Sequence, residues 1–582
     1  MADADDSDMA RAIALSLGQE DPILKTGQEI IDLDADNEQT PPYRKTPSQP
    51  HPSTTSHNDE ARKSGVYRDT NDPSTYTPGI LGMAGLDRKK MEEERLARKR
   101  KATDPAPASP PTKKNVKASS ITTSPDQAAP VDMPSSSHPA ILQYPYGIVK
   151  KTWVAGHPRA GDDIKLEEVL QAEDLDVALL SSFQWDLPWV LSKLRPETQV
   201  GLVMQAKDEN AKDRARAAVS SMENRTIQFC FPSMDGQINC MHSKLTLLSH
   251  VNYLRIVIPT ANLVKYDWGE TGTMENSVFL IDLPRFYPRQ RVDEEDLLPF
   301  AKDLTRFLTA QSLPASIIGS LRLFDFAATR PYAFVHTIGG AHLGSTAYNT
   351  TGWPSLATAI NRLGLNTTAP ISVDFITSSV GSLNMDFLTR IYAACQGRKA
   401  SSPSSSSSSS NPDERQVKQR FRLYFPTHAT VRSSTARSAG TICMQRSYWT
   451  TDRFPKSVMR DCQSVRPGCL MHNKIIFVRP DGDEGGKKAW AYVGSANCSE
   501  SAWGNKLVKD KVTKGMKLNA RNWECGVVVP VVLERQEEEG DGEETVKRGN
   551  GLEVFEGRVP VPMVWPGREY GERMPWFFME EG

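Results

Sequence analysis

The stretches "CMHSKLTLL" (240–248) and "LMHNKIIFV" (470–478) share one pattern. Each has a histidine and, two residues later, a lysine that opens an apolar run: His242 with Lys244, and His472 with Lys474. The chain has 10 histidines, and only these two are followed by a lysine at that spacing. The apolar runs predict strands, in which residues i and i+2 point to the same face. Each histidine–lysine pair can therefore meet one ligand.

The sequence that follows the two motifs is also repeated. After a turn comes a second apolar run, "YLRIVIP" (253–259) or "AWAYV" (489–493), and then an asparagine, Asn262 or Asn497. Several features that recur in one order indicate a duplicated fold. One motif alone would suggest an ordinary strand end, because short motifs often match by chance. Two motifs with matched surroundings argue against that interpretation.

These residue types suit chemistry at phosphorus. Imidazole can act as a nucleophile or a general acid near neutral pH, and lysine is a compact cation suited to phosphate oxygens. A histidine, a lysine and an asparagine from each half would enclose a phosphate with one histidine on either side. One histidine could then attack while the other protonates the leaving group. Lysines and amides can carry the transition-state charge, so we expect no metal and no cofactor.

The paired motif resembles that of the phospholipase D superfamily. That superfamily usually has an aspartate five residues after the lysine, where this chain has Ser249 and Arg479. A motif without this aspartate is similar to that of the tyrosyl-DNA phosphodiesterases, which repair DNA joined to type IB topoisomerase. The resemblance covers about residues 141–582. It also includes the segments "SSFQWDLPWVL" (181–191), "SSVGSL" (378–383), "VGSANCSESAWG" (493–504), "RNWECGVVVP" (521–530) and "YGERMPW" (570–576).

The resemblance implies an α/β fold with two similar α-β-α sandwich domains and an active site at their pseudo-twofold interface. We expect the first half at 141–338 and the second at 339–582, with flexible insertions at 398–415 and 534–551. It implies that His242 is the nucleophile and His472 the general acid and base. The residues expected to hold the phosphate are Lys244, Lys474, Asn262 and Asn497.

Further roles follow from the same resemblance. Glu524 matches the acidic residue that orients one catalytic histidine. Its first-half counterpart falls in "TMENSV" (273–278), where the family often has glutamine; we predict Glu275, with Asn276 as the alternative. The residues expected to contact DNA are Phe183, Ser379, Ser382 and Ser499. The family often has an aromatic residue shortly before the nucleophile, where this chain has Ile238.

Composition sets the N-terminal part of the chain apart. Residues 1–140 hold 16 of the 40 prolines and none of the 11 tryptophans, so we expect a disordered tail. The first residues are acidic, which argues against a secretory signal, and no apolar run approaches the length of a membrane span. The 8 cysteines include no C-x-x-C pair, which argues against a zinc site and favours a reducing compartment.

Three motifs lie in this tail. Residues 9–20 resemble a ubiquitin-interacting helix, and the residues expected to bind ubiquitin are Met9, Ala12, Ile13 and Ser16. Residues 29–36 resemble a motif for the small ubiquitin-like modifier, and 88–101 a nuclear import signal, which predicts a nuclear protein. The alternatives are a chance amphipathic turn, a chance apolar triplet and a solvated charged helix.

The sequence therefore predicts a DNA-repair phosphodiesterase. Its expected substrate is a 3′ end of single-stranded or nicked DNA that carries a tyrosyl peptide from topoisomerase I, and its expected intermediate is a phosphohistidine. Two alternatives stay open. One is a nuclease or phospholipase of the same superfamily, and the other is an inactive adaptor for ubiquitin-like modifiers.

Overall fold

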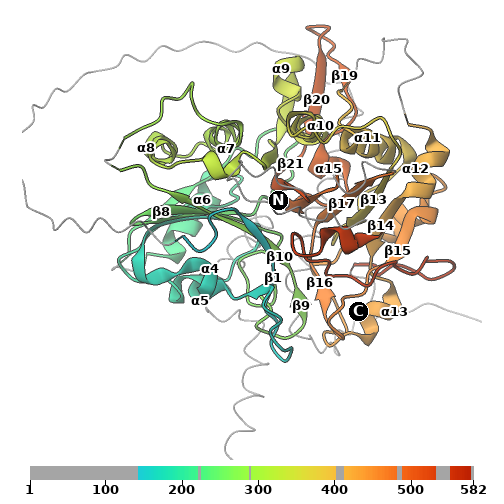
Figure 1. The fold of residues 1–582 in the computed structure, drawn as a ribbon, viewed down its shortest axis with the longest axis horizontal. Coiled ribbons are helices and arrows are strands. Elements are labelled where there is room, and N and C mark those ends of the chain that lie inside the picture. The colour runs from blue at the N-terminus through green and yellow to red at the C-terminus, as the bar shows by residue number, and fades with distance from the viewer. Residues whose placement is uncertain are drawn as a thin grey trace, which may run out of the picture.

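The computed structural model describes residues 142–220, 225–287, 290–400, 412–481, 488–531 and 551–578. Figure 1 shows two sheets side by side, with helices on their outer faces and between them. The three motifs expected in the tail lie outside the described residues. No helix within the described ranges is long and apolar enough to cross a membrane.

The first sheet is built from the first half of the chain. Its strands, in spatial order, are β2 (Asp163–Ile164), β1 (Ile148–Thr152), β10 (Ser277–Pro284), β8 (Tyr253–Pro259), β7 (Leu245–His250), β3 (Leu175–Ser181), β4 (Gln199–Val203) and β5 (Ile227–Cys230). The runs "LTLL" and "YLRIVIP" form β7 and β8, as expected. Every residue of β8 is buried, which is typical of a strand covered on both faces.

The second sheet repeats this topology. Its strands, in spatial order, are β11 (Ala333–Thr337), β21 (Asn522–Pro530), β18 (Trp490–Gly494), β17 (Ile475–Pro480), β13 (Ile371–Ile376), β14 (Phe421–Phe425) and β15 (Met459–Asp461). Across the sheet, the spatial order of the seven strands from β11 to β15 is the same as the order of the seven strands from β1 to β5 in the first sheet. The directions match as well, since β3 runs parallel to β4 and antiparallel to β7, and β13 does the same with β14 and β17. The duplication expected from the two motifs is thus present in the fold.

Helices cover both sheets. Those of the first half are α4 (Leu166–Leu170), α5 (Leu187–Ser192), α6 (Glu209–Ala218), α7 (Pro299–Ala310) and α8 (Ala315–Ser320). Those of the second half are α9 (Ser345–Tyr348), α10 (Gly352–Arg362), α11 (Met385–Cys395), α12 (Glu414–Arg420), α13 (His428–Ser433), α14 (Arg446–Trp449) and α15 (Glu500–Trp503). Local sequence sets the start of several helices. Asp186 precedes α5, and its carboxylate accepts a bond from the N–H of Trp189.

The two sheets share a central hydrophobic core. One face of each sheet contributes to it, with Ile256 and Phe279 from the first and Phe477 and Val527 from the second, and Phe307 of α7 lies among them. A core that contains residues of both sheets fixes the two halves relative to each other. The halves are therefore a single packed body around their shared interface.

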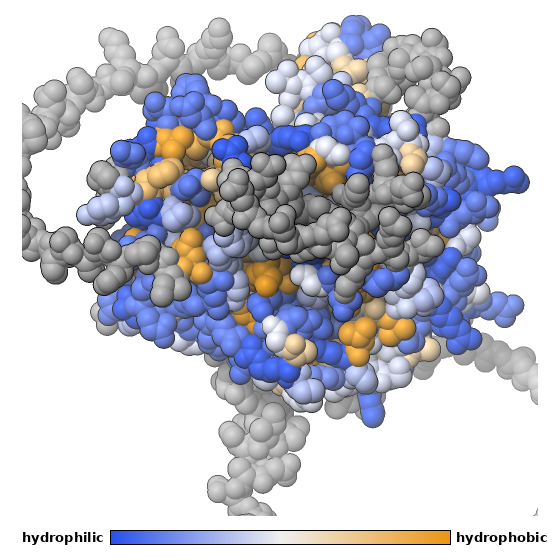
Figure 2. Space-filling view, viewed as in Figure 1, coloured by the Kyte–Doolittle hydropathy of each residue, from blue (hydrophilic) through white to orange (hydrophobic). Residues whose placement is uncertain are grey.

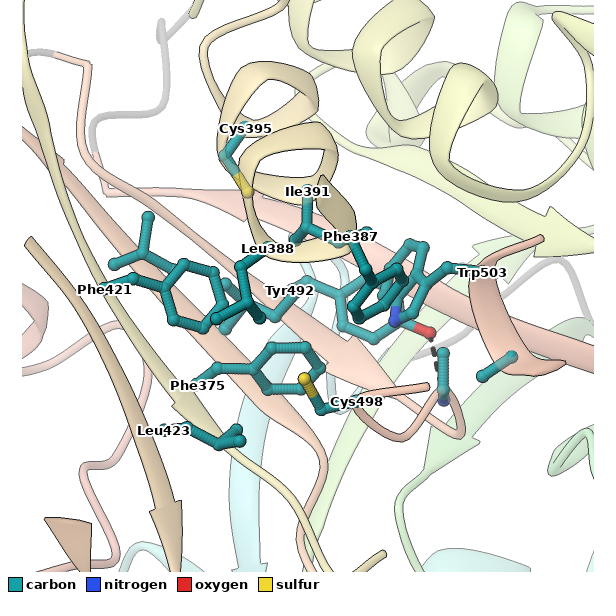
Figure 3. Close-up of a cluster of buried hydrophobic side chains, with 14 of the residues drawn as sticks. Phe375, Phe387, Leu388, Ile391, Cys395, Phe421, Leu423, Tyr492, Cys498 and Trp503 are labelled. Atoms are coloured by element: carbon teal, nitrogen blue, oxygen red, sulfur yellow. Dashed lines mark hydrogen bonds between the residues drawn. The ribbon is translucent and has the colours of Figure 1, made fainter. Parts of the chain in front are cut away.

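The opposite face of each sheet packs against its own helices. Figure 3 shows this outer core in the second half, where Phe387, Leu388 and Ile391 of α11 lie over Phe375 of β13 and Phe421 of β14. Phe375 and its neighbour Ile376 belong to opposite cores, as strand alternation requires. This packing holds the carboxyl ends of β13 and β14 at the edge where the site lies.

Short strands cross between the halves just before each motif histidine. They are β6 (Cys240–Met241), which runs parallel to β21, and β16 (Leu470–Met471), which runs parallel to β9 (Met274–Glu275). The backbone N–H of His242 then bonds to the carbonyl of Trp523, and that of His472 to the carbonyl of Glu275. Each histidine is thereby attached to the opposite half of the molecule.

The division expected at residues 338 and 339 is wrong by one strand. β11 precedes that point but pairs with β21 of the second sheet, and α7 packs against β11. The second sheet therefore begins at Ala333. The strands of a further small sheet are β12 (Gly340–Leu343), β20 (Met516–Ala520) and β19 (Val508–Lys509), with β19 and β20 forming a hairpin that projects at the top of Figure 1.

Candidate active site

His242 is oriented by a carboxylate from the other half. Its Nδ1 lies 2.9 Å from Oε2 of Glu524 in β21, as the sequence predicted. Glu524 is itself held by Ser495, whose hydroxyl donates to Oε2 at 2.6 Å, and by Asn522, whose amide donates to Oε1 at 2.9 Å. A carboxylate on Nδ1 fixes the tautomer of the imidazole and leaves Nε2 available as a nucleophile.

His472 has the mirrored arrangement, with a partner that sequence reasoning missed. Its Nδ1 lies 3.0 Å from Oδ2 of Asp267, a fully buried residue of the first half. The same Oδ2 accepts the backbone N–H of Asn262 at 2.6 Å. Each imidazole is therefore supported by a carboxylate from the opposite half, and the sites are related by the pseudo-twofold axis.

The prediction that Glu275 orients this histidine is wrong. Its carboxylate accepts bonds from Ser464 and from Arg466, the latter at 2.8 Å, and does not meet His472. The reason is strand alternation, because neighbouring residues of an extended segment point to opposite faces. Since Met471 pairs with Glu275, the residue that faces His472 is the next one, Asn276.

Asn276, the alternative for this role, does occupy the position equivalent to Glu524. Its amide nevertheless bonds to other groups: Nδ2 donates to the carbonyl of Asp267 at 2.8 Å, and Oδ1 accepts the hydroxyl of Thr260 at 2.8 Å. Asn276 therefore positions the residue that orients the histidine. Asp267 lies five residues after Asn262 in "NLVKYDW" (262–268), a loop with no periodic signal by which the sequence could have revealed it.

Both motif lysines are fully buried beside the histidines. Nζ of Lys244 lies 3.4 Å from Nε2 of His242 and donates to the carbonyl of the same residue at 2.9 Å. Lys474 donates to the carbonyl of His472 and, at 3.4 Å, to that of Thr260 in the first half. The two ammonium groups therefore lie beside the two motif histidines.

The two asparagines are held by neighbouring loops. Oδ1 of Asn497 accepts the backbone N–H of Ser379 at 3.0 Å and the hydroxyl of Thr377 at 3.1 Å. These bonds fix the plane of the amide and direct its NH₂ group to the opposite side. The amide of Asn262 is paired with Gln184, with Nδ2 donating to Oε1 at 3.1 Å.

Burial and charge set the protonation of the site. Burial raises the pKa of Glu524 to about 7, although both Lys244 and Lys474 act to lower it. Burial also lowers the pKa of His472 to about 4, assisted by both lysines and opposed by Asp267. Because the same two lysines act on groups of both halves, the motifs form one electrostatic unit. His472 is therefore neutral at pH 7 in the free protein.

Of the residues expected to contact DNA, Phe183 lies beside the first histidine–lysine pair, and the three serines lie on adjoining loops of the second half. The ring centroids of Phe183 and His242 are 5.2 Å apart, and Nζ of Lys244 lies 5.8 Å from the Phe183 ring. The loops that carry Ser379 and Ser382, and then Ser499, adjoin each other, since the backbone N–H of Gly381 bonds to the carbonyl of Cys498. Ile238 is 4 % exposed and packs in the central core, so it offers no surface for a base.

Comparison with known proteins agrees with this geometry. The sequence model of the tyrosyl-DNA phosphodiesterase family matches residues 148–571, which include the histidine, lysine and asparagine of both repeated motifs. The chain belongs to this family. It is thus a tyrosyl-DNA phosphodiesterase by class, a DNA-repair phosphodiesterase with the phospholipase-D-like fold.

Solved structures of the family show the same fold. A yeast tyrosyl-DNA phosphodiesterase with one histidine replaced by asparagine is 18 % identical and has a TM-score of 0.53, and the match covers 74 % of this chain and 100 % of that one. A yeast enzyme with a histidine replaced by alanine is 17 % identical with a TM-score of 0.51, covering 74 % of this chain and 99 % of that one. At these identities the likeness concerns the fold.

Proposed function

We propose that this tyrosyl-DNA phosphodiesterase hydrolyses the bond between a DNA 3′-phosphate and the tyrosine of a topoisomerase I peptide, through a covalent phosphohistidine. The observation that carries the proposal is the pair of buried imidazoles, each fixed at Nδ1 by a carboxylate of the opposite half. Nε2 of His472 is buried with no hydrogen-bond partner among the described residues. A buried nitrogen in this state needs a partner, and a substrate group met in the reaction would supply one.

In the first step, Nε2 of His242 attacks phosphorus. The new P–N bond forms as the P–O bond to tyrosine breaks, and the proton on Nε2 of His472 passes to the phenolate oxygen. His472 must therefore be charged when substrate is bound. The negative phosphate beside it favours the imidazolium and raises the pKa of His472 from its low value in the free protein.

In the second step, His472 is neutral and acts as a base. It takes a proton from water as the water oxygen attacks phosphorus and the P–N bond to His242 breaks. The products are a DNA 3′-phosphate and the enzyme with His472 charged again. The lysines and the NH₂ group of Asn497 hold the phosphate oxygens in both steps, so the charge that develops in each transition state meets fixed donors.

Cleavage of a 3′-phosphotyrosyl oligonucleotide is expected to proceed in excess EDTA. The reason is that every proposed step uses imidazole, ammonium and amide groups. The measurement is a gel that separates the substrate from the 3′-phosphate product, with a magnesium-dependent nuclease as a control for complete chelation. Loss of cleavage in EDTA, with recovery on addition of magnesium, would contradict the mechanism.

The superfamily alternatives have less support. At the two positions where a phospholipase-type motif has aspartate, Ser249 accepts a bond from Arg285 and Arg479 donates to Asp374 at 2.6 Å. Both positions therefore serve the fold at a distance from the histidines. An inactive adaptor would have no need of two imidazoles aligned with carboxylates.

The tail motifs extend the proposal to location and partners. We propose a nuclear enzyme whose residues 9–20 bind ubiquitin and whose residues 29–36 bind the small ubiquitin-like modifier. The support is the sequence pattern alone: four residues on one helical face between acidic flanks at 9–20, a short β-prone apolar run with acidic flanks at 29–36, and a basic cluster at 88–101. Ubiquitin titrated onto the full chain should shift NMR signals of Met9, Ala12, Ile13 and Ser16, and unchanged signals would contradict the proposal.

A further inference from the structure

A basic hairpin stands at the rim of the active site. Between Gly504 and Asn522 the chain has five lysines, one arginine and a single acidic residue, Asp510, which gives a net charge of +5 in a protein whose total is −1. This segment contains β19 and β20, and we call it the basic arm. A local excess of this size creates a positive potential that global charge does not reveal.

The one acidic residue of the basic arm is used to build its turn. The carboxylate of Asp510 accepts the backbone N–H groups of Val512 and Thr513 at 3.1 and 2.9 Å, and the ammonium of Lys517 at 2.8 Å. The Asp510–Lys517 pair is internally neutralised. The charges of the other lysines are directed outward, since Lys506, Lys509, Lys511 and Lys514 are exposed.

Both ends of the basic arm are anchored in the active-site wall. Before it lies Ser499, a predicted DNA contact, whose hydroxyl caps α15. After it, Asn522 donates to Glu524, and the carbonyl of Arg521 accepts the N–H of Asn239 at 2.6 Å, three residues before His242. The five residues of β20 span about 16 Å, so the arm carries its lysines outward from the site. Figure 2 shows hydrophilic side chains at its tip.

We infer that the basic arm binds the phosphate backbone of the DNA beyond the scissile 3′ end, and so holds the duplex against the active site. This rests on the proposed function only for the position of the 3′ end. Exposed lysines on a positively charged arm are best suited to bind the negatively charged phosphates of DNA. The large exposed apolar side chains of the small sheet, within its described residues, are Val512 and Leu343, too few for the apolar centre of a protein interface.

Salt dependence of binding tests the inference directly. Removing one lysine–phosphate interaction should reduce the slope of log K against log salt by about 0.9 on duplex DNA and about 0.7 on a single strand. The variant is the triple substitution Lys509→Ala, Lys511→Ala and Lys514→Ala, and its slope on a blunt duplex should be about 2 to 3 smaller than that of the unaltered chain. Fluorescence anisotropy on DNA without an adduct measures this, so the result does not depend on cleavage.

A matched control variant removes three positive charges at the end of the second sheet that lies away from the site. Arg415 and Lys418 lie on α12, which leads into the start of β14, and Lys488 precedes the start of β18. The strands β14 and β18 run toward the site and end there. Arg415, Lys418 and Lys488 lie near the starts of these strands, and therefore far from the site. The triple alanine variant of these three should keep the slope of the unaltered chain. Thermal unfolding should change little in either variant, because five of the six altered side chains are exposed and the sixth, Lys488, is partly exposed.

A substrate too short to reach the basic arm separates its role from catalysis. The arm variant should cleave a single nucleotide 3′-aryl ester with unchanged kcat and KM, and should raise KM on a long duplex substrate. An unchanged salt slope would overturn the inference, as would an equal loss in the matched variant. The inference would also be overturned if the arm variant kept its salt slope and raised KM only for substrates with a long peptide. That result would indicate that the arm binds the peptide.

Discussion

Replacing His472 by asparagine is expected to trap a covalent enzyme–DNA adduct, whereas His242→Ala should form none. His472→Asn keeps Nε2 of His242, the proposed nucleophile, and the partner of that histidine, Glu524. A positioned acid is typically worth about 10²- to 10⁴-fold, and tyrosine, with a pKa of about 10, is a fair leaving group, so the first step should survive in part. The second step loses the base that activates water, and the adduct should accumulate.

In the proposed mechanism, His242→Ala removes the atom that attacks phosphorus. Loss of a nucleophile in a hydrolase can cost on the order of 10⁶ in kcat, so turnover should fall close to background. A denaturing gel after mixing each variant with labelled 3′-phosphotyrosyl DNA shows whether DNA migrates with the protein. An adduct in the His242 variant and none in the His472 variant would reverse the two roles. Full turnover of His242→Ala would indicate direct attack by water.

Much of the site could be predicted from the sequence because it lies on regular elements. His242, Lys244, His472 and Lys474 lead directly into buried strands, where an i, i+2 spacing determines which side chains share a face. Glu524 followed from the resemblance of the segment "RNWECGVVVP" (521–530) to the family, and this segment forms the strand β21. The duplicated order of strands followed from the duplicated motifs.

The remaining features depend on contacts between distant segments. The first half ends earlier than expected because β11 gains its hydrogen bonds from β21, which lies far later in the chain, and no local pattern records that pairing. Asp267 lies in an irregular loop, and it reaches His472 only because β16 pairs with β9 of the other half. The sequence showed an acidic residue at Glu275 but could not show which way the strand turns it.

Substitution of Asp267 is expected to have the second large effect on activity. We expect Asp267→Asn to lower kcat by on the order of 10⁴, the loss seen when the carboxylate beside the catalytic histidine of a serine protease becomes an amide. The ionised carboxylate accepts a bond from Nδ1 of His472 and favours the imidazolium that the first step consumes. An amide at this position loses that charge and can stabilise the wrong tautomer. Single-turnover kinetics measures both steps, and both should slow, because the same imidazole is the proposed acid of the first step and the proposed base of the second.

Glu275→Gln is the matched control, because it makes the same chemical change at a buried carboxylate of the same half. Kinetic constants of the folded protein should change by less than about 3-fold, since the Glu275 side chain faces Ser464 and Arg466 instead of the histidine. Its cost should appear in stability: removing one partner of a buried ion pair typically costs about 3–5 kcal/mol, which urea unfolding measures. The two variants should therefore differ: Asp267→Asn should lose activity, and Glu275→Gln should lose stability. If Glu275→Gln lowers kcat as far as Asp267→Asn in protein shown to be folded, then the orienting carboxylate is Glu275 and the loop carrying Asp267 has been placed wrongly.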